Sequence, residues 1–172
     1  MIGLSDKFPE KIHRIERCET TFPAKKVQKE LILSLVKINS KTLSFEEITY
    51  PTIPNCKIIF ETGLAEAKTF NYIDEEERNR FLKALRNETF KLLDLFVAIR
   101  YYQTHQEKSI PLNFDYYLMR IIFEKKVIEF RVFHERGPRY ISPEDLVSVI
   151  INEINKNSIK KKGKMIIKNV DN

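Results

Sequence analysis

The sequence has few of the residues that mark several classes of protein. Of its 172 residues, four are Gly, seven are Pro and two are Cys, Cys18 and Cys56. So little glycine and proline excludes a collagen-like or Gly/Pro-rich chain, and two cysteines cannot make a disulfide framework. No apolar run approaches the ~20 residues of a membrane-spanning helix, and no apolar signal-peptide region is seen. These absences predict an intracellular, cytoplasmic protein without membrane contact.

The usual motifs of catalysis are also missing. The histidines His13, His105 and His134 do not have the spacing of a zinc site, and isolated glycines make no phosphate-binding loop. Asp115 and Glu124 imitate the acids of a metal-dependent nuclease, but a strand between them would hold them about 30 Å apart. Carboxylates at that separation cannot share a cation. We therefore expect no cofactor, no metal and a noncatalytic role.

Aromatic residues and lysines are plentiful. Twelve Phe and seven Tyr, with 42% apolar and 31% charged residues, predict a folded globular chain. The net charge is +6, of which +5 lies in residues 156–172 and +1 in residues 1–155. The sequence thus predicts one globular domain, 1–155, and a flexible lysine-rich tail, 156–172. This tail is either a solvated terminus or a nucleic-acid tether that displaces counterions; the tether residues are Lys160, Lys161, Lys162 and Lys164.

The apolar periodicity predicts an α+β fold that is predominantly helical. A stripe of apolar residues predicts an amphipathic helix over 24–38; it consists of Val27, Leu31, Leu35 and Ile38. Asp74 and the acids after it predict the start of a long central helix that reaches about residue 105, with a break allowed near Asn87. Its second half is apolar on most sides, which is typical of a buried helix.

Two stretches before this central helix leave alternatives open. Residues 12–22 are either a short strand or an extended lead-in, and a connector with two prolines, 39–55, follows the first helix. Residues 56–73 form either two short strands that turn at Gly63-Leu64 or a helix over 55–68, and their alanine and glutamate content slightly favours the helix.

The C-terminal part predicts a loop, a β-hairpin and a final helix. Residues 109–113 are expected to be the loop, and 115–123 and 127–134 the two strands. A two-residue turn at Lys125-Lys126 pairs apolar residues with one another, such as Phe123 with Ile128, and it also places Arg120 opposite Arg131. Ser142 and Pro143 are expected to open the final helix, 143–155, as its N-cap and first-turn proline.

The Arg120–Arg131 pair is the most informative local feature. Two like charges directly opposite each other destabilise a sheet, so something anionic should lie between them. The favoured candidate is Glu129 or another carboxylate of the protein, and the other is a phosphate that the guanidinium groups bind in bidentate fashion. Further potential phosphate-binding residues follow this hairpin, namely His134, Arg136 and Arg139.

Several short motifs occur in the order found in one known family. They are Ile53-Pro54-Asn55-Cys56, Arg80-Phe81, Tyr117 followed by Arg120, and Ile141-Ser142-Pro143. Over residues 50–155 the sequence resembles the C-terminal domain of the archaeo-eukaryotic primase large subunit. That family ligates an iron–sulfur cluster with four cysteines, of which only Cys56 is matched here. The resemblance therefore implies a cluster-free form, similar to primase X, the small accessory subunit of some archaeal primases.

The resemblance implies a noncatalytic nucleotide- and nucleic-acid-binding accessory subunit of a DNA replication complex. Its partners would be the catalytic and large primase subunits, single-stranded DNA and a nucleoside triphosphate. Binding of the nucleotide would fall on Arg80, Arg120 and Arg131. The residues themselves support one alternative: a nearly neutral body rich in aromatic residues is also typical of a protein-interaction scaffold without nucleic-acid affinity.

Overall fold

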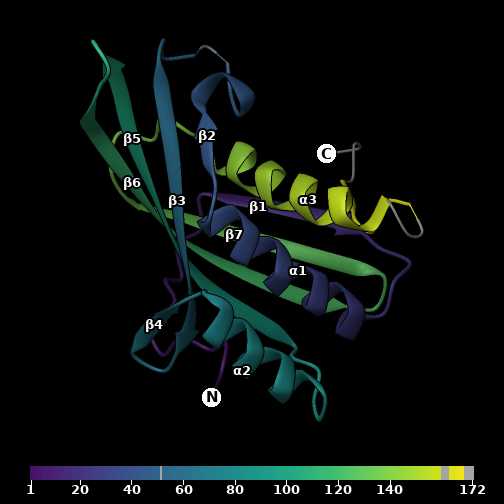
Figure 1. The fold of residues 1–172 in the computed structure, drawn as a ribbon. Coiled ribbons are helices and arrows are strands. Elements are labelled where there is room, and N and C mark those ends of the chain that lie inside the picture. Colours follow the sequence, from purple (N-terminus) through teal and green to yellow (C-terminus); the bar gives the residue numbers. More distant parts are fainter. Residues whose placement is uncertain (51, 160–162, 169–172) are drawn as a thin grey trace.

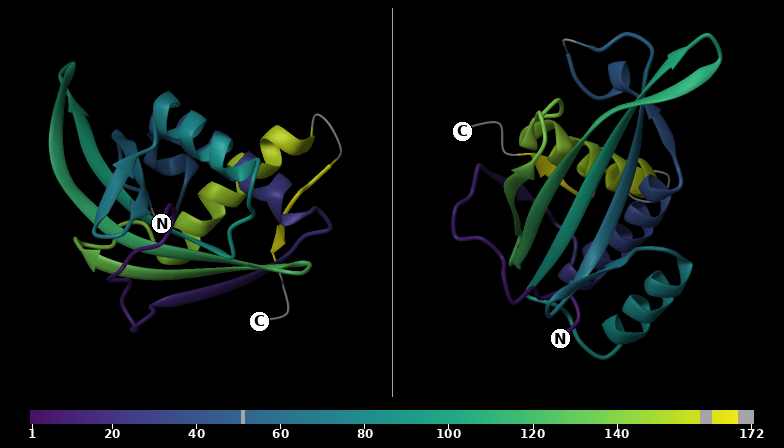
Figure 2. Two further views of the ribbon diagram at one scale, coloured as in Figure 1. Left: turned by 90° about the horizontal axis from the view of Figure 1, so that it is seen from below. Right: turned by 90° about the vertical axis from the view of Figure 1, so that its left-hand side faces the viewer.

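The computed structural model describes residues 1–50, 52–159 and 163–168. An eight-stranded antiparallel sheet dominates this part of the chain, in the order β2-β3-β5-β6-β7-β1-β8, with β4 paired to β3. The sheet curls, and the helices lie on its concave side (Figures 1 and 2). The expectation of a predominantly helical fold with a long central helix is therefore wrong.

The elements follow one another along the chain as β1 (Arg14–Glu19), α1 (Ala24–Asn39), β2 (Thr42–Ser44), a 3-10 turn (Phe45–Glu47), β3 (Cys56–Glu66), β4 (Thr69–Tyr72), α2 (Glu75–Leu85), β5 (Leu92–His105), β6 (Lys108–Glu124), β7 (Val127–Arg136), α3 (Pro143–Ile159) and β8 (Ile167–Lys168). Within these ranges, no helix has both the length and the hydropathy needed to cross a membrane.

The largest correction concerns the expected helix over 74–105. The predicted start is confirmed, because Asp74 accepts a hydrogen bond from the Glu77 amide as the N-cap of α2. The helix, however, ends at Leu85 and does not reach residue 105. Strand β5 follows. In β5, Leu95 lies in the core while its neighbour Phe96 points to the opposite side of the sheet and is only half-buried. With apolar residues on both sides, the strand has no alternation to distinguish it from a buried helix.

Two further stretches expected to be helix and loop are strands. Residues 56–73 form β3 and β4, so the slightly favoured helix is wrong; the turn lies at Ala67-Lys68, with Ala67 at a φ of 54°, and not at Gly63-Leu64. Residues 109–113 belong to β6, where they pair with β5. The paired β5 and β6 extend beyond the rest of the sheet as a two-stranded arm (Figure 2).

The amphipathic elements are confirmed. Helix α1 covers the predicted stretch and buries all four residues of its predicted stripe. The β6–β7 hairpin has the predicted register, with Phe123 opposite Ile128 and Arg120 opposite Arg131. Helix α3 starts at Pro143, and the Asp145 amide donates to the Ser142 hydroxyl at 3.0 Å, as an N-cap requires.

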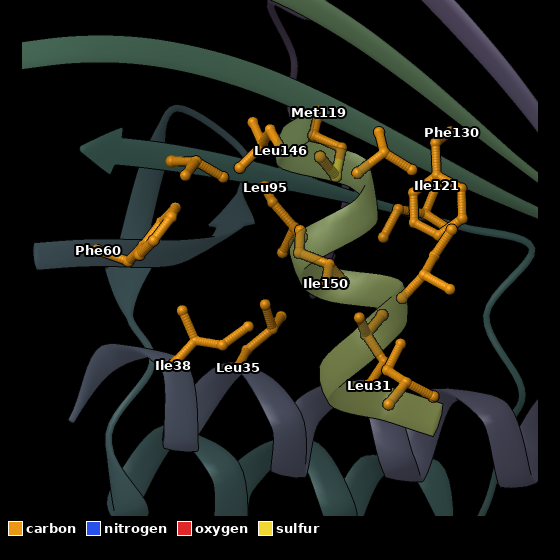
Figure 3. Packing of buried hydrophobic residues seen from close by; sticks show 14 of the residues in the cluster. Leu31, Leu35, Ile38, Phe60, Leu95, Met119, Ile121, Phe130, Leu146 and Ile150 are labelled. Carbon is orange, nitrogen blue, oxygen red and sulfur yellow. The ribbon is translucent and has the colours of Figure 1, made fainter. Parts of the chain in front are cut away.

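Helices α1 and α3 pack against each other and against the concave side of the sheet. Figure 3 shows side chains of α1 and α3 meeting those of β3, β5, β6 and β7. Removal of these side chains from water is the main force that holds the layers together, at about 25 cal/mol for each Å² of apolar surface. Residues of this core that Figure 3 labels are Leu31, Leu35, Ile38, Phe60, Leu95, Met119, Ile121, Phe130, Leu146 and Ile150.

Part of the segment assigned to the lysine-rich tail is attached to this core. Met165 and Ile166 are buried. The Asn155 side chain accepts hydrogen bonds from both of their amides and donates to the Ile166 carbonyl. Strand β8 then pairs with the end of β1 at Cys18 and Glu19. Residues 163–168 are thus held in a defined place beside β1 and α3.

Candidate functional site

The two arginines that the sequence singles out lie opposite each other, as predicted, but each is already paired with a carboxylate. Arg120 donates two hydrogen bonds to the buried Asp94, at 2.7 and 2.9 Å, and lies 4.5 Å from the centre of the Phe8 ring. The hydrogen bond to Asp94 raises the pKa of Arg120. Arg131 donates to Glu129 at 2.5 Å, and Arg17 donates to the same carboxylate at 2.7 Å. The like charges thus need no external anion.

The structure does not collect the other predicted phosphate-binding residues around this pair. Arg80, on α2, forms ion pairs with Glu66 and Glu77. Arg136 is exposed at the end of β7, and Arg139 is exposed in the turn after it. Of the predicted tether, Lys164 is exposed, whereas Lys160, Lys161 and Lys162 lie outside the described residues.

His134 belongs to a buried cluster around Asp115, beneath the two-stranded arm. The Asp115 carboxylate is fully buried and accepts four hydrogen bonds. The donors are the Tyr101 hydroxyl at 2.6 Å, the Arg139 amide at 2.6 Å, the Tyr140 amide at 3.0 Å and, as an N–H, His134 Nε2 at 2.8 Å. Burial, followed by the hydrogen bond to Asp115, raises the pKa of Tyr101 above its usual range.

Gly137 is the other essential part of this cluster. Its φ is +112°, and an added Cβ would lie 2.2 Å from the Phe114 carbonyl and 2.4 Å from Asp115 Oδ1. Only glycine allows the turn to approach the carboxylate so closely. By accepting from the Arg139 and Tyr140 amides, Asp115 fixes the turn between β7 and α3. Within the described residues, no group of three or more His, Cys, Asp or Glu is placed to hold a metal ion.

The convex side of the sheet carries a continuous row of aromatic rings. Phe70 of β4 lies 5.6 Å from Phe96 of β5, Phe96 lies 5.3 Å from Tyr116 of β6, and Tyr116 lies 4.7 Å from Phe114, measured between ring centroids. All four are half-buried. They point away from the helices, because their strand neighbours Leu95 and Tyr117 are fully buried on the other side. We call these four residues the outer aromatic surface.

A hollow of about 540 Å³ adjoins this surface at Phe70 and Phe96. Its charged lining residues are Lys7, Lys68 and Glu135; the others are Ser5, Ala67 and Leu118. On the arm, Ile110 and Leu112 are also exposed, at 47% and 39%. A contiguous apolar surface of this kind on a folded protein marks an interaction site more often than a single exposed residue does.

Sequence reasoning missed the outer aromatic surface because it read β5 as a helix. The available signal was weak: Phe96 and Ala98 are apolar like their neighbours, and only Arg100 and Tyr102, at the same spacing of two, interrupt the apolar run. Read with period two, these residues share one side of a strand, and Tyr116 of the predicted hairpin would have lain beside them; Phe114 fell between the predicted loop and the predicted strand.

Comparison with known proteins gives no assignment. No family model and no curated protein matches the sequence. One solved structure, the toxic C-terminal tip of CdiA from Pseudomonas aeruginosa in complex with an immune protein, shows 13% identity over 88% of this chain and 83% of that chain, with a TM-score of 0.25. A likeness this low supports no inference about fold or function.

Proposed function

We propose that the protein is a noncatalytic accessory subunit that docks a partner protein on the outer aromatic surface. The row of four rings on the side of the sheet opposite the helices carries this proposal. Aromatic residues are enriched in protein interfaces because they bury much surface at a small entropic cost. The neighbouring hollow would accept an apolar side chain of the partner beside Phe70 and Phe96.

The charges around the surface favour a protein over a nucleic acid. A single strand would stack its bases on such rings, but it also needs cations along its backbone. Here Arg100 donates to Glu61 at 3.0 Å, and Arg120 is taken up by Asp94. Paired arginines among aromatic rings are typical of protein interfaces. Lys7 and Lys68, which line the hollow together with Glu135, suit a partner that carries a carboxylate beside its apolar residue.

The proposal that this subunit belongs to a primase complex rests on the resemblance to the primase large subunit. If that resemblance reflects ancestry, the docked partner is another primase subunit. The neutralised arginines remove the local argument for a nucleotide at the β6–β7 hairpin. Partner docking is therefore the part of the predicted accessory role that the geometry supports.

Purification of the tagged protein from its own organism tests the proposal. Phe96→Ser/Tyr116→Ser should abolish recovery of the partner, because it removes the centre of the ring row. A matched control is Ile15→Ser/Tyr50→Ser, which removes exposed apolar residues at two other places, 49% and 91% exposed. Thermal unfolding of both variants shows whether the fold is intact. Equal recovery with all three proteins, or no partner with any of them, would refute the proposal.

A further inference from the structure

A second hollow, of about 350 Å³, lies at the end of the molecule where β6 turns into β7. It is lined by Glu19, Thr20, Thr21, Lys126, Val127, Lys164, Met165 and Ile167. We infer that this hollow and the lysines around it bind the sugar–phosphate backbone of a nucleic acid. This site, which we call the lysine end, is separate from the outer aromatic surface and goes beyond the proposed docking function.

Hydrogen bonds fix the three chain segments that form the lysine end. The Thr20 amide donates to the Lys126 carbonyl at 3.0 Å, and the Thr20 hydroxyl donates to the Met165 carbonyl at 2.7 Å. The Phe22 amide in turn donates to the Thr20 hydroxyl at 3.1 Å. The backbone at Lys126 and Lys164 is therefore held in place, although the ammonium groups can move.

Positive charge predominates there. Lys125, Lys126 and Lys164 are exposed, and the ammonium group of Lys26 lies 5.2 Å from the centre of the Phe22 ring. Glu19 is the acidic residue of the lining. Helix α1 starts at the same end, with no acid in its first turn and no side-chain cap, so its positive end adds to the potential. In the sequence, lysines 160–162 precede this stretch, but they lie outside the described residues and the inference does not rest on them.

The arrangement fits a nucleic-acid backbone better than a membrane surface. Lysines from separate segments around an open hollow can contact successive phosphates and release their counterions. Membrane binding by a basic helix needs an apolar face to insert. Helix α1 turns its apolar residues inward instead, and Val27 and Leu31 are buried in the core.

Fluorescence anisotropy of a labelled oligothymidylate with the purified full chain tests the site. Lys126→Gly/Lys164→Ser removes two charges, and glycine suits the positive φ of 64° at residue 126. We expect about tenfold weaker binding at low salt. A plot of the logarithm of the binding constant against the logarithm of the salt concentration should also have a slope that is smaller in magnitude by about 1.4, since each lost phosphate contact accounts for about 0.7. Lys57→Ser/Lys108→Ser, an equal change of charge at exposed lysines at the opposite end of the sheet, should have little effect.

Other outcomes would overturn the inference. If both double variants weaken binding equally, only the net charge matters. If replacement of lysines 160–162 by serine abolishes binding while Lys126→Gly/Lys164→Ser does not change it, binding resides in the tether and not in the hollow. If the lysine end is required for sedimentation with phosphatidylglycerol vesicles but not for oligonucleotide binding, the ligand is a membrane. No partner protein is present, so failure here leaves the docking proposal untouched.

Discussion

At the scale of single residues, Asp115 joins several elements through one buried carboxylate. It connects β6 to β5 through Tyr101, to β7 through His134 and to the turn before α3 through two amides. An unsatisfied donor buried away from water costs about 1–3 kcal/mol. Several donors depend on this one carboxylate, so its contribution should be measurable in a single substitution.

Asp115→Asn should lower the free energy of unfolding by about 3 kcal/mol, because the amide group replaces an acceptor with a donor among buried N–H and O–H groups. Urea denaturation measures this change. Asp6→Asn, at an exposed position, is the control and should be nearly neutral. A loss of less than about 1 kcal/mol for Asp115→Asn would mean that the cluster contributes little.

His13 should make stability depend on pH. Its Nδ1 accepts a hydrogen bond from the His134 amide at 2.8 Å, and its ring stacks on Phe133. Burial, then the nearby charges of Arg139, Lys11 and His134, lower the pKa of His13 from its ordinary 6.5. The unfolded chain therefore binds the proton more readily, so this contribution is complete above about pH 6.5 and is lost as the pH falls.

His13→Asn keeps an acceptor for the His134 amide but cannot be protonated. Stability of the wild-type protein should fall more than that of this variant between pH 7 and pH 5, as thermal unfolding in a pH series would show. Parallel curves for the two proteins would assign the pH dependence to other groups.

At the scale of elements, Asn39 closes a gap in the edge of the sheet. Strand β3 pairs with β2 at one end and with β4 at the other. Between them, the Asn39 side chain accepts from the Thr62 amide at 2.8 Å and donates to the Thr62 and Ile73 carbonyls. It takes the place of a strand and satisfies backbone groups that an open edge would leave unpaired.

Asn39→Ala should cost about 2 kcal/mol, because it leaves backbone groups of β3 without partners. Chemical denaturation measures the effect against Asn152→Ala, an exposed position on α3. Asn39→Asp, which sets a carboxylate oxygen against the Thr62 and Ile73 carbonyls, should cost at least as much as Asn39→Ala if the Asn39 bonds act as described. An Asn39→Ala variant as stable as the control would exclude a role for this side chain.

The two-stranded arm should be the least stable part of the sheet. Gln103 is the last β5 residue paired with β3, and the Thr104 amide still donates to the Asn55 carbonyl at 2.9 Å; beyond Thr104, within the described chain, β5 pairs with β6 alone. A two-stranded hairpin is marginally stable in water. Amides of residues 105–110 should therefore exchange with deuterium much faster than those of Val97–Ile99 in the free protein. Equal protection would show that the arm is stabilised by contacts of another kind.

The same elements show how far the sequence alone could go. Helices α1 and α3 were predictable because each buries one apolar side, and the β6–β7 register followed from matching apolar pairs. Strand β5 was not predictable, since the apolar residues on both of its sides conceal the period of two that marks a strand. That error also concealed Asp94, the carboxylate that neutralises Arg120, because β5 was read as part of a helix. The position of the arginine pair and one of its partners, Glu129, could be predicted, but Asp94 could not.

At the scale of the whole molecule, the two candidate surfaces lie in different places and have different chemistry. The outer aromatic surface covers the convex side of β4, β5 and β6, with its nearby arginines paired to carboxylates. The lysine end gathers exposed lysines where β1, β7 and the segment 163–168 meet. Such a division suits a subunit that binds a protein with one surface and a nucleic acid with another.

Site-specific photocrosslinking tests the central claim, that the outer aromatic surface docks a partner protein. A photoreactive phenylalanine analogue replaces Phe96 in one version of the chain and Tyr50, which is 91% exposed and far from the ring row in sequence, in another. Irradiation in the native cells should yield one discrete protein adduct from position 96 and none from position 50. The same adducts from both positions, or none from position 96, would contradict the account.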